Sequence, residues 1–186
     1  GDLDHTDNER YYIAPSVAID LSDQTRLTVL SSLQKDDGVP VNGFKLPYGT
    51  IDDTPYGKVD RSANLGQPGY DKNDRTQTAI GYELEHTMDE TWSFMQNVRY
   101  NRLDLELRSV YAGAQNPTDP RVADQGLVYR DGTTDGWTMD NRLMGQIFTD
   151  RLENTLLVGR DYQRLTAEGD EYDVFPSYDF NNGVYF

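Results

Sequence analysis

Apolar and polar residues alternate at every second position along several segments of this chain. In residues 10–21 one set of alternate positions is small or polar, and the other set is apolar. The apolar set comprises Tyr11, Ile13, Pro15, Val17, Ile19 and Leu21. A period of two is typical of a β-strand with one apolar face. A strand over 9–21, a short turn at 22–25 and a second strand over 26–35 are therefore predicted to form a hairpin.

The same plan repeats twice further along the chain. Strands are predicted over 75–86 and 91–108, joined by a turn at 87–90, and over 134–148 and 153–165, joined by a turn at 149–152. Beyond Arg102 the apolar positions shift by one residue to Leu103, Leu105 and Leu107. Such a shift predicts a β-bulge near 101–103. The pattern as a whole predicts an all-β, antiparallel up-and-down meander of about six strands.

The connections between these strands are of two kinds. Three are tight turns, whereas the others are long, at 36–74, 109–130 and 166–186. Loops in compact domains have a median length of only about 4–6 residues. Short turns on one side and long loops on the other are typical of outer-membrane β-barrels. Aromatic residues near the strand ends suit the girdles of such barrels, namely Tyr11, Tyr12, Trp92, Phe94, Tyr100, Trp137 and Tyr162.

The composition is compatible with a barrel and excludes a membrane protein built from helices. Hydrophobic residues make up 36% of the 186 positions and charged residues 26%. No stretch reaches the roughly 18 apolar residues of a spanning helix. A spanning β-strand needs an apolar residue only at every second position. The same alternation also describes a soluble β-sandwich, whose apolar face packs against a second sheet.

The net charge is −15, and the chain contains no cysteine. No basic patch stands out, so a nucleic-acid partner is not expected. The zero cysteine count neither requires nor excludes export. Residues 1–10 are polar and look like the end of a loop rather than a signal peptide. The chain is therefore expected to begin and end in loops, as a fragment would.

Several segments resemble TonB-dependent siderophore receptors. Residues 66–77, Gly-Gln-Pro-Gly-Tyr-Asp-Lys-Asn-Asp-Arg-Thr-Gln, are similar to the G-E-P-G-Y-D-K-x-D-R-T-Q stretch of that family. Further similar blocks follow the family's order, at 8–16, 81–86, 96–100 and 154–164. Together the blocks cover most of the chain. The resemblance is greatest to the branch that takes up hydroxamate siderophores such as ferrichrome and ferrioxamine.

This resemblance implies a 22-stranded barrel in the outer membrane of a Gram-negative bacterium, closed by an N-terminal plug. The implied function is TonB-dependent uptake of a ferric siderophore, with the TonB complex acting through the plug. Outer-membrane lipid and lipopolysaccharide would surround the wall. Six strands cannot close a barrel of that width, and open edges are not tolerated in lipid. We therefore expect the chain to be part of a longer polypeptide.

The resemblance also implies candidate ligand contacts. Residues 43–47, Gly-Phe-Lys-Leu-Pro, resemble the Gly-aromatic-Leu-Pro element of the hydroxamate receptors, which gives Phe44 the role of the contacting aromatic. Lys45 is an insertion in that element, and Asn42 stands where a close relative has Tyr. Tyr111 lies where the family places a contacting Tyr, although Gly113 replaces the next expected aromatic. The weaker ligand-binding candidates are Asn42, Tyr48, Tyr70, Phe175 and Tyr178.

Neither a catalytic site nor a metal site is predicted. Asp36–Asp37 and Asp52–Asp53 lack the Asp-x-Asp-x-Asp spacing of a calcium loop and are expected to be solvated. Glu83 and Glu85 are expected to line the wet lumen rather than to act as an acid–base pair. His5 and His86 are isolated, so a zinc site is not expected. No cofactor is expected either, since iron would be carried as the ferric siderophore.

Two further readings remain open at this point. One is a soluble β-rich carbohydrate-binding or structural module, which would be soluble without detergent. The other is a passive porin-like barrel, whose uptake would persist without TonB. The loop at 36–74 is mildly acidic, which favours a neutral or cationic chelate over an anionic catecholate one. An enzyme is not predicted under any of these readings.

Overall fold

The computed structural model describes residues 3–41, 45–115, 122–175 and 184–185. All eight strands belong to one antiparallel sheet, in the spatial order β1-β3-β4-β5-β6-β7. β2 pairs with β3 beside β1, and β8 pairs with β6. The strands are β1 Asn8–Ile13, β2 Ser16–Ser22, β3 Thr25–Gly38, β4 Lys72–Thr87, β5 Trp92–Gln115, β6 Val122–Phe148, β7 Glu153–Val174 and β8 Val184–Tyr185.

β1 and β2 are two halves of one long strand. Both pair with β3 in a single register, and only Ala14 and Pro15 separate them. Proline has no backbone N–H to give to the ladder, so the pairing is interrupted there. The carbonyl oxygen of Pro15 still accepts a hydrogen bond from the backbone N–H of Ser31, at 3.0 Å. The expected all-β meander of about six long strands is confirmed.

Several strands extend beyond their predicted ends. The expected loop at 109–130 is wrong, because β5 continues to Gln115 and β6 begins at Val122. The first nine residues of the expected loop at 166–186 belong to β7. The loop expected at 36–74 is also shorter, since β3 ends at Gly38 and β4 begins at Lys72. In the extended ends of β6 and β7 polar residues occupy both faces, so the alternation that marks a strand fades there.

The β-bulge predicted near 101–103 is absent from the structure. Ala79 pairs with Asn101 and Gln77 with Leu103 in one uninterrupted register. The apolar positions change face in this part of β5, whereas the backbone pairing does not change. Leu103, Leu105 and Leu107 therefore lie on the face opposite to Val98. When the apolar residues of a strand change from one face to the other, the sequence pattern shifts by one position, as it would at a β-bulge.

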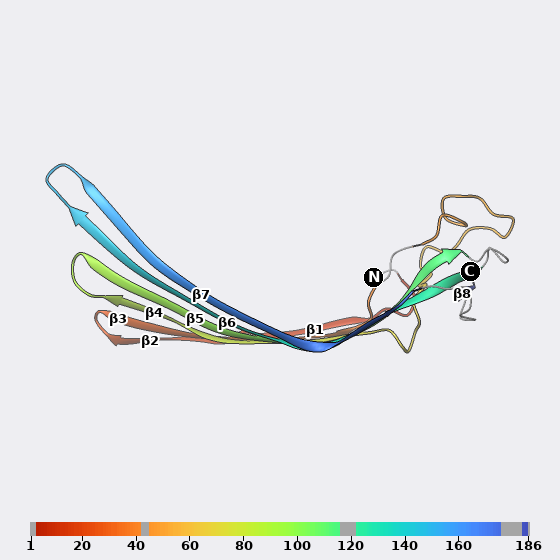
Figure 1. Ribbon diagram of the computed structural model, residues 1–186, viewed down its shortest axis with the longest axis horizontal. Helices are drawn as coiled ribbons and strands as arrows, with labels where there is room; N and C mark the ends of the chain where they lie inside the picture. Colours follow the sequence, from red (N-terminus) through yellow and green to blue (C-terminus); the bar gives the residue numbers. More distant parts are fainter. Residues whose placement is uncertain (1–2, 42–44, 116–121, 176–183, 186) are drawn as a thin grey trace.

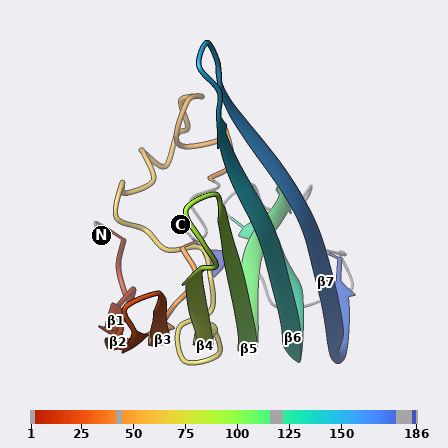
Figure 2. The same cartoon turned by 90° about the vertical axis from the view of Figure 1, so that its left-hand side faces the viewer.

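The sheet is a trough that bends along the length of its strands (Figure 1). The three tight turns lie together at one end, and the long connections and both chain termini lie at the other. Figure 2 shows the strands side by side from the turn end, with β7 at one edge. This separation of turns and loops agrees with the short and long connections seen in the sequence. Among the described residues, no helix is long and apolar enough to cross a membrane.

The two faces of the sheet differ in polarity toward the turn end. Residues paired directly across antiparallel strands point to the same face. One such row crosses the convex face and is apolar, consisting of Val17, Val29, Tyr82, Val98, Met139 and Tyr162. The adjacent row on the concave face is small or polar, consisting of Ala18, Thr28, Glu83, Asn97, Asp140 and Asp161. The apolar side is thus the outside of the trough, as in a membrane barrel.

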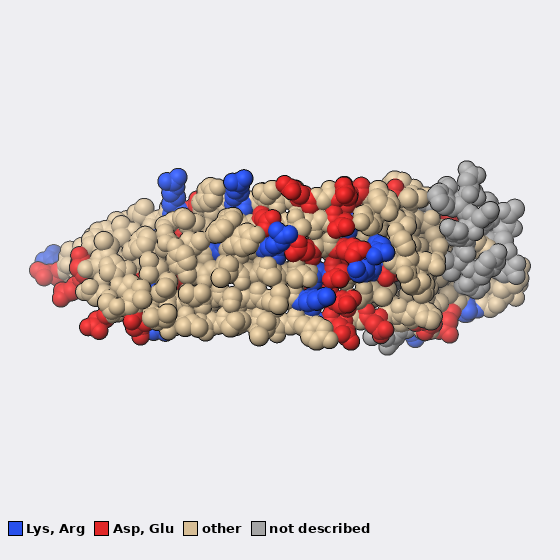
Figure 3. Space-filling model, turned by 90° about the horizontal axis from the view of Figure 1, so that it is seen from below, with Lys and Arg blue, Asp and Glu red and all other residues tan. Residues whose placement is uncertain are grey.

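Charged side chains form a belt across the convex face nearer the loop end (Figure 3). One row of directly paired residues in this belt is entirely acidic, consisting of Glu9, Asp37, Asp74, Glu106, Asp131 and Asp170. Lys72 and Arg108 offset part of this charge, each through an ion pair with Glu106, at 2.5 and 2.6 Å. The aromatic pair Tyr100 and Trp137 lies between the apolar rows and the belt, with ring centroids 4.9 Å apart. The lipid-facing band therefore ends close to this pair.

Candidate functional site

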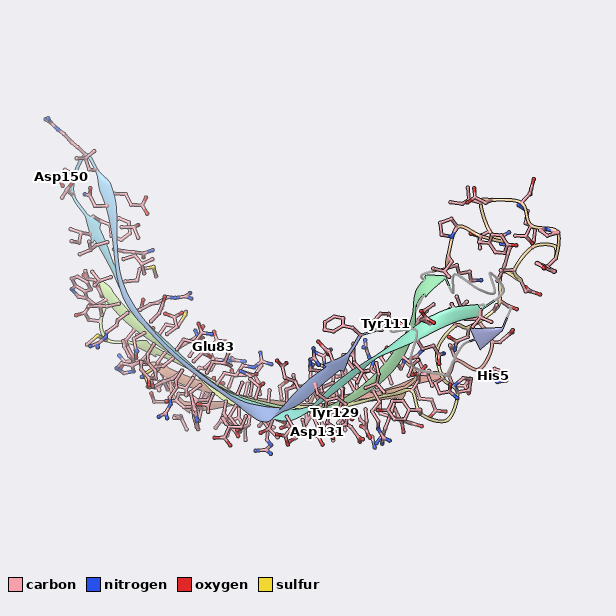
Figure 4. All side chains as sticks on the ribbon, turned by 45° about the vertical axis from the view of Figure 1, so that its right-hand side comes forward. His5, Glu83, Tyr111, Tyr129, Asp131 and Asp150 are labelled. Atoms are coloured by element: carbon pink, nitrogen blue, oxygen red, sulfur yellow. The ribbon has the colours of Figure 1, made fainter. Side chains whose placement is uncertain are left out.

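Tyr111 lies on the concave face near the outer end of β5 (Figure 4). It belongs to the same face as Leu107 and Ser109, because alternate residues of a strand share a face. Its direct partner across the sheet is Gly126 of β6. The Tyr111 ring lies over this glycine and fills the space that a side chain would occupy. The ring is therefore placed at the mouth of the trough, on its inner wall.

A buried carboxylate fixes the end of the long loop next to this tyrosine. Asp71 is only 7% exposed. One of its oxygens accepts a hydrogen bond from the backbone N–H of Val110, at 2.7 Å, and the other accepts one from Gln67, at 2.8 Å. Burial raises the pKa of the Asp71 carboxyl, although the two hydrogen bonds act in the opposite direction. We call this contact between Asp71 and Val110 the loop joint.

The small buried core of the described protein surrounds the loop joint. Its apolar members come from the loop and from the outer ends of β5 and β6, and they are Leu65, Val110, Val122 and Ala123. The polar side chains of Ser109 and Asp124 are buried beside them. Elsewhere the wall is a single sheet whose faces remain accessible. Val110 and Gln125 share the convex face, and the Gln125 side chain donates to the carbonyl oxygen of Leu65, at 3.4 Å. The core therefore holds the end of the loop against the outer side of β5, across the sheet from Tyr111.

The loop between β3 and β4 has its own internal order. The carbonyl oxygen of Pro47 accepts hydrogen bonds from the backbone N–H groups of Thr50, Ile51 and Asp52, at 2.9–3.1 Å. The ammonium group of Lys45 donates to the carbonyl oxygens of Asp60 and Arg61, at 2.7 and 2.6 Å. Backbone and side-chain hydrogen bonds from Ser62 hold the pKa of the Asp60 carboxyl below its usual range. These bonds shape the segment 45–71 before any ligand is present.

The inner wall next to the mouth carries a row of three leucines on β5 among mostly polar neighbours. Leu103, Leu105 and Leu107 occupy successive concave positions of β5 and are half-buried. A shallow hollow of about 300 Å³ lies between Leu103 and Leu105 on one side and residues 167–171 of β7 on the other. Arg130 stands beside it, held by Asp173 at 2.6 Å and Glu171 at 3.1 Å. An organic ligand would meet apolar surface here as well as fixed charge.

The structure separates the predicted ligand residues. Phe44, Asn42 and Tyr178 lie outside the described residues. Tyr111 faces the concave side, whereas Tyr70 lies beyond the convex side, with the Arg108 guanidinium 5.7 Å from its ring centre. Arg108 shares that side with Lys72 and Tyr129, its direct partners on the neighbouring strands. Tyr111 and Tyr70 therefore cannot contact one small ligand, because the wall lies between them.

The two remaining ligand candidates contribute less to the mouth. Tyr48 is half-buried in the loop, where it forms an isolated bridge with Asp52. Phe175 follows directly after β7 and is 74% exposed. Their predicted role as ligand contacts stays a prediction.

The acidic candidates are dispersed. Asp36 pairs with Arg10 on the concave face, and its neighbour Asp37 lies on the convex face. Asp53 forms an ion pair with Lys58, at 2.6 Å, in the loop. Among the residues that the structure describes, no three histidine or acidic side chains lie close enough to hold a metal ion.

Two residues near Tyr111 are missed by sequence reasoning. Asp71 belongs to the Gly-Tyr-Asp-Lys block at 69–72, so its motif is visible but its contact with Val110 is not. Gly126 gives no signal in the sequence, because its importance depends on pairing with Tyr111 across the sheet. The strand register is needed to find both.

Comparison with known families gives a match over almost the whole chain. Residues 12–186 match the family described as TonB dependent receptor-like, beta-barrel. The Ferrioxamine B receptor of Salmonella typhimurium strain SL1344 is 34% identical over 185 residues, covering 95% of this chain and 25% of that protein. The Ferrichrome outer membrane transporter/phage receptor of Escherichia coli K12 is 26% identical over 180 residues, covering 86% of this chain and 24% of that protein. The chain spans about a quarter of the length of these curated relatives.

Solved structures with a similar fold are also membrane receptors. A Pseudomonas aeruginosa FpvA structure bound to a heterologous pyoverdine matches with a TM-score of 0.78 and 20% identity, covering 98% of this chain and 24% of that one. The Ferric-Catecholate import receptor Fiu of E. coli K12, in its open form, matches with a TM-score of 0.75 and 20% identity, covering 90% and 28%. These matches concern the fold, and they place the curved six-stranded sheet within a larger barrel wall.

Proposed function

Because this chain belongs to the family of TonB-dependent receptor β-barrels, we propose that it forms six strands of a receptor that imports a ferric siderophore. Its place is the outer membrane of a Gram-negative bacterium, where this family resides. The iron is cargo, carried as the ferric chelate, and no resident cofactor is part of the proposal. The chelate would enter at the loop end and descend along the concave face.

The observation that carries this proposal is the position of Tyr111. An aromatic ring at the mouth of a polar trough presents an apolar surface where a ligand arrives from outside. The loop joint fixes the neighbouring loop, and the leucines of β5 continue the apolar surface inward. Pre-formed, largely apolar surfaces with a few fixed polar groups are typical of small-molecule sites.

A hydroxamate chelate is the ligand class that we propose. The ferrioxamine and ferrichrome receptors among the relatives support it by their names. The charge of the mouth supports it as well, since the described loop from 45 to 71 carries four aspartates and three basic residues. A strongly anionic chelate would gain little from such a surface.

The partners follow from the same proposal. The TonB complex would deliver energy through a plug domain, which would lie outside the sequence given. Lipid would contact the apolar convex rows, and lipopolysaccharide would face the charged belt above them. A passive barrel is the competing transport mode, and loss of uptake in a strain without TonB would argue against it. We propose no enzymatic activity for the receptor.

Replacing Tyr111 in the complete receptor tests the ligand site. We expect Tyr111→Ala to weaken binding of ferrioxamine B roughly tenfold or more, on the scale of losing an anchoring aromatic residue. Tyr70→Ala is the matched control, because Tyr70 lies on the other side of the wall, and its affinity should stay within about twofold of the wild type. Equal affinity of Tyr111→Ala and the wild-type receptor would refute the assignment.

A further inference from the structure

Gly126, the direct partner of Tyr111 on β6, determines how the Tyr111 ring is oriented. A Cβ atom built on Gly126 would lie 2.5 Å from the hydroxyl oxygen of Tyr111 and 2.8 Å from its Cε1. Real carbon atoms do not approach so closely, so the ring occupies the place of a side chain. Gly126 is buried although it lies at the mouth of the trough. The tyrosine ring therefore covers this glycine.

Gly126 is not needed for backbone reasons. The described glycines with positive φ are Gly49, Gly57 and Gly69, and Gly126 is not among them. Alanine could adopt its ordinary strand conformation without strain. The three atoms nearest to a Cβ at this position all belong to the Tyr111 ring, which is thus the obstacle to a side chain there.

The same arrangement occurs once more between the same two strands. Trp92 of β5 pairs with Gly145 of β6, and a Cβ atom on Gly145 would lie 2.6 Å from Cζ3 of Trp92. That pair is at the turn end and on the convex face, far along the strands from Tyr111. Aromatic rings are known to cover glycines of neighbouring strands and to stabilise the pairing. The Trp92 pair therefore offers an internal control for a purely structural role.

We propose that Gly126 is a positioning residue for ligand recognition, which holds the Tyr111 ring flat on β6 with one face open to the trough. This inference rests on the proposed function, because it concerns the ring that the chelate would contact. A ring held flat presents its apolar face to a ligand, whereas a ring pushed away from β6 presents its edge and occupies the mouth itself. Specificity would then depend on a residue that never touches the ligand.

The consequence is a coupling between two positions that binding measurements can detect. Gly126→Ala would displace the ring and weaken binding of ferrioxamine B by about tenfold, similar to the loss from Tyr111→Ala. In a receptor that already carries Tyr111→Ala the second substitution would add almost nothing, since no ring remains to be moved. A double-mutant cycle measures this non-additivity directly.

The experiment measures ferrioxamine B affinity for the complete receptor and for Gly126→Ala, Tyr111→Ala and the double variant, all in the same detergent. Gly145→Ala and Gly136→Ala serve as controls. The first displaces a ring far from the mouth, and the second adds a methyl group to the concave face of β6, where the nearest atom, Cδ1 of Leu165, is 3.4 Å away. Both controls should keep wild-type affinity. The thermal unfolding midpoint of each variant shows whether its barrel is intact.

The outcomes separate the two proposals. Wild-type affinity of Tyr111→Ala would refute the ligand site itself. A weakened Tyr111→Ala together with an unaffected Gly126→Ala would refute the positioning role and leave the ligand site standing. Equal losses from Gly126→Ala with and without Tyr111 would also overturn the inference, because they would show an effect that does not pass through the ring.

Discussion

The carboxylate of Asp71 accepts a hydrogen bond from the backbone N–H of Val110, which lies 39 positions further along the chain, at a distance of 2.7 Å. This bond ties the end of the long outer loop to the strand that carries Tyr111. The second carboxylate oxygen accepts a hydrogen bond from the backbone N–H of Gln67. The buried Asp71 side chain therefore joins the loop backbone to the strand backbone. The attachment of the loop end to β5 thus involves this one side chain.

Removing the Asp71 carboxylate should therefore release the loop. We expect Asp71→Ala to destabilise the docked loop by about 1–3 kcal/mol, because the buried backbone N–H of Val110 loses its acceptor and the partly exposed N–H of Gln67 loses a second bond. Limited proteolysis of the complete receptor would report this as faster cleavage within 45–71. Asp53→Ala is the control, since the Asp53 side chain is 93% exposed. Equal protease resistance of both variants would contradict the role of the loop joint.

The stabilising effect of Asp71 should depend on pH in an unusual direction. Burial raises the pKa of this carboxyl, so the folded protein binds the proton more tightly than the unfolded chain does. The stability that comes from binding this proton is therefore present below the ordinary aspartate pKa and is lost as the pH rises through the raised value, above which the hydrogen bonds to the carboxylate remain. We expect the wild type to gain stability relative to Asp71→Asn as the pH falls from neutral toward the ordinary aspartate range. Denaturant unfolding at several pH values would measure the difference, and a pH-independent difference would refute it.

The assignment of the two faces can be tested with one pair of substitutions. Val98 lies in the apolar convex row and Asn97 in the polar concave row. An arginine facing lipid near the middle of a membrane destabilises a barrel by about 2–4 kcal/mol, whereas one facing a wet lumen does not. Val98→Arg should therefore destabilise the complete receptor in lipid vesicles, and Asn97→Arg should not. The reverse order of stabilities would show that the faces are exchanged.

The bend of the trough predicts an intolerant position at Gly132. Gly132 pairs with Gly169, and a Cβ atom on Gly132 would lie 2.5 Å from the carbonyl oxygen of Glu168 and 2.9 Å from Cα of Gly169. Backbone atoms cannot turn aside as a side chain can, so Gly132→Ala should destabilise the receptor by about 1–3 kcal/mol. Gly136→Ala, with its nearest atom 3.4 Å away, should change stability far less. Heat-induced unfolding would rank the two variants.

The sequence predicts the fold where one face of a strand meets lipid and the other meets water. The hairpins at the turn end follow this rule, so their strands and turns are found within a few residues. Above the lipid both faces meet water, and the alternation fades, which is why the outer ends of β6 and β7 were expected to be loops. The leucines at 103, 105 and 107 lie in the same region, above the lipid. There apolar side chains are on the inner face, so the rule that apolar residues mark the outer face no longer holds.

The positions of the candidate residues were predictable only in part. The resemblance selects both Tyr111 and Tyr70, but only the structure shows that Tyr111 lies on the inner wall and Tyr70 beyond the outer side. Their roles as ligand contacts stay predictions. The hydrogen bond of Asp71 to Val110 and the pairing of Gly126 with Tyr111 depend on the fold, which no local pattern reveals.

The length of β5 has a consequence for how a ligand first meets the receptor. The strand passes Tyr100, close to the end of the lipid-facing band, and continues to Tyr111. Eleven residues of strand span roughly 35 Å, or roughly 25 Å of height when the strand is tilted as in known barrels. Under the proposed function, the chelate would therefore first be bound well above the lipid surface. The height of Tyr111 above the lipid-facing band would exceed the size of a small chelate.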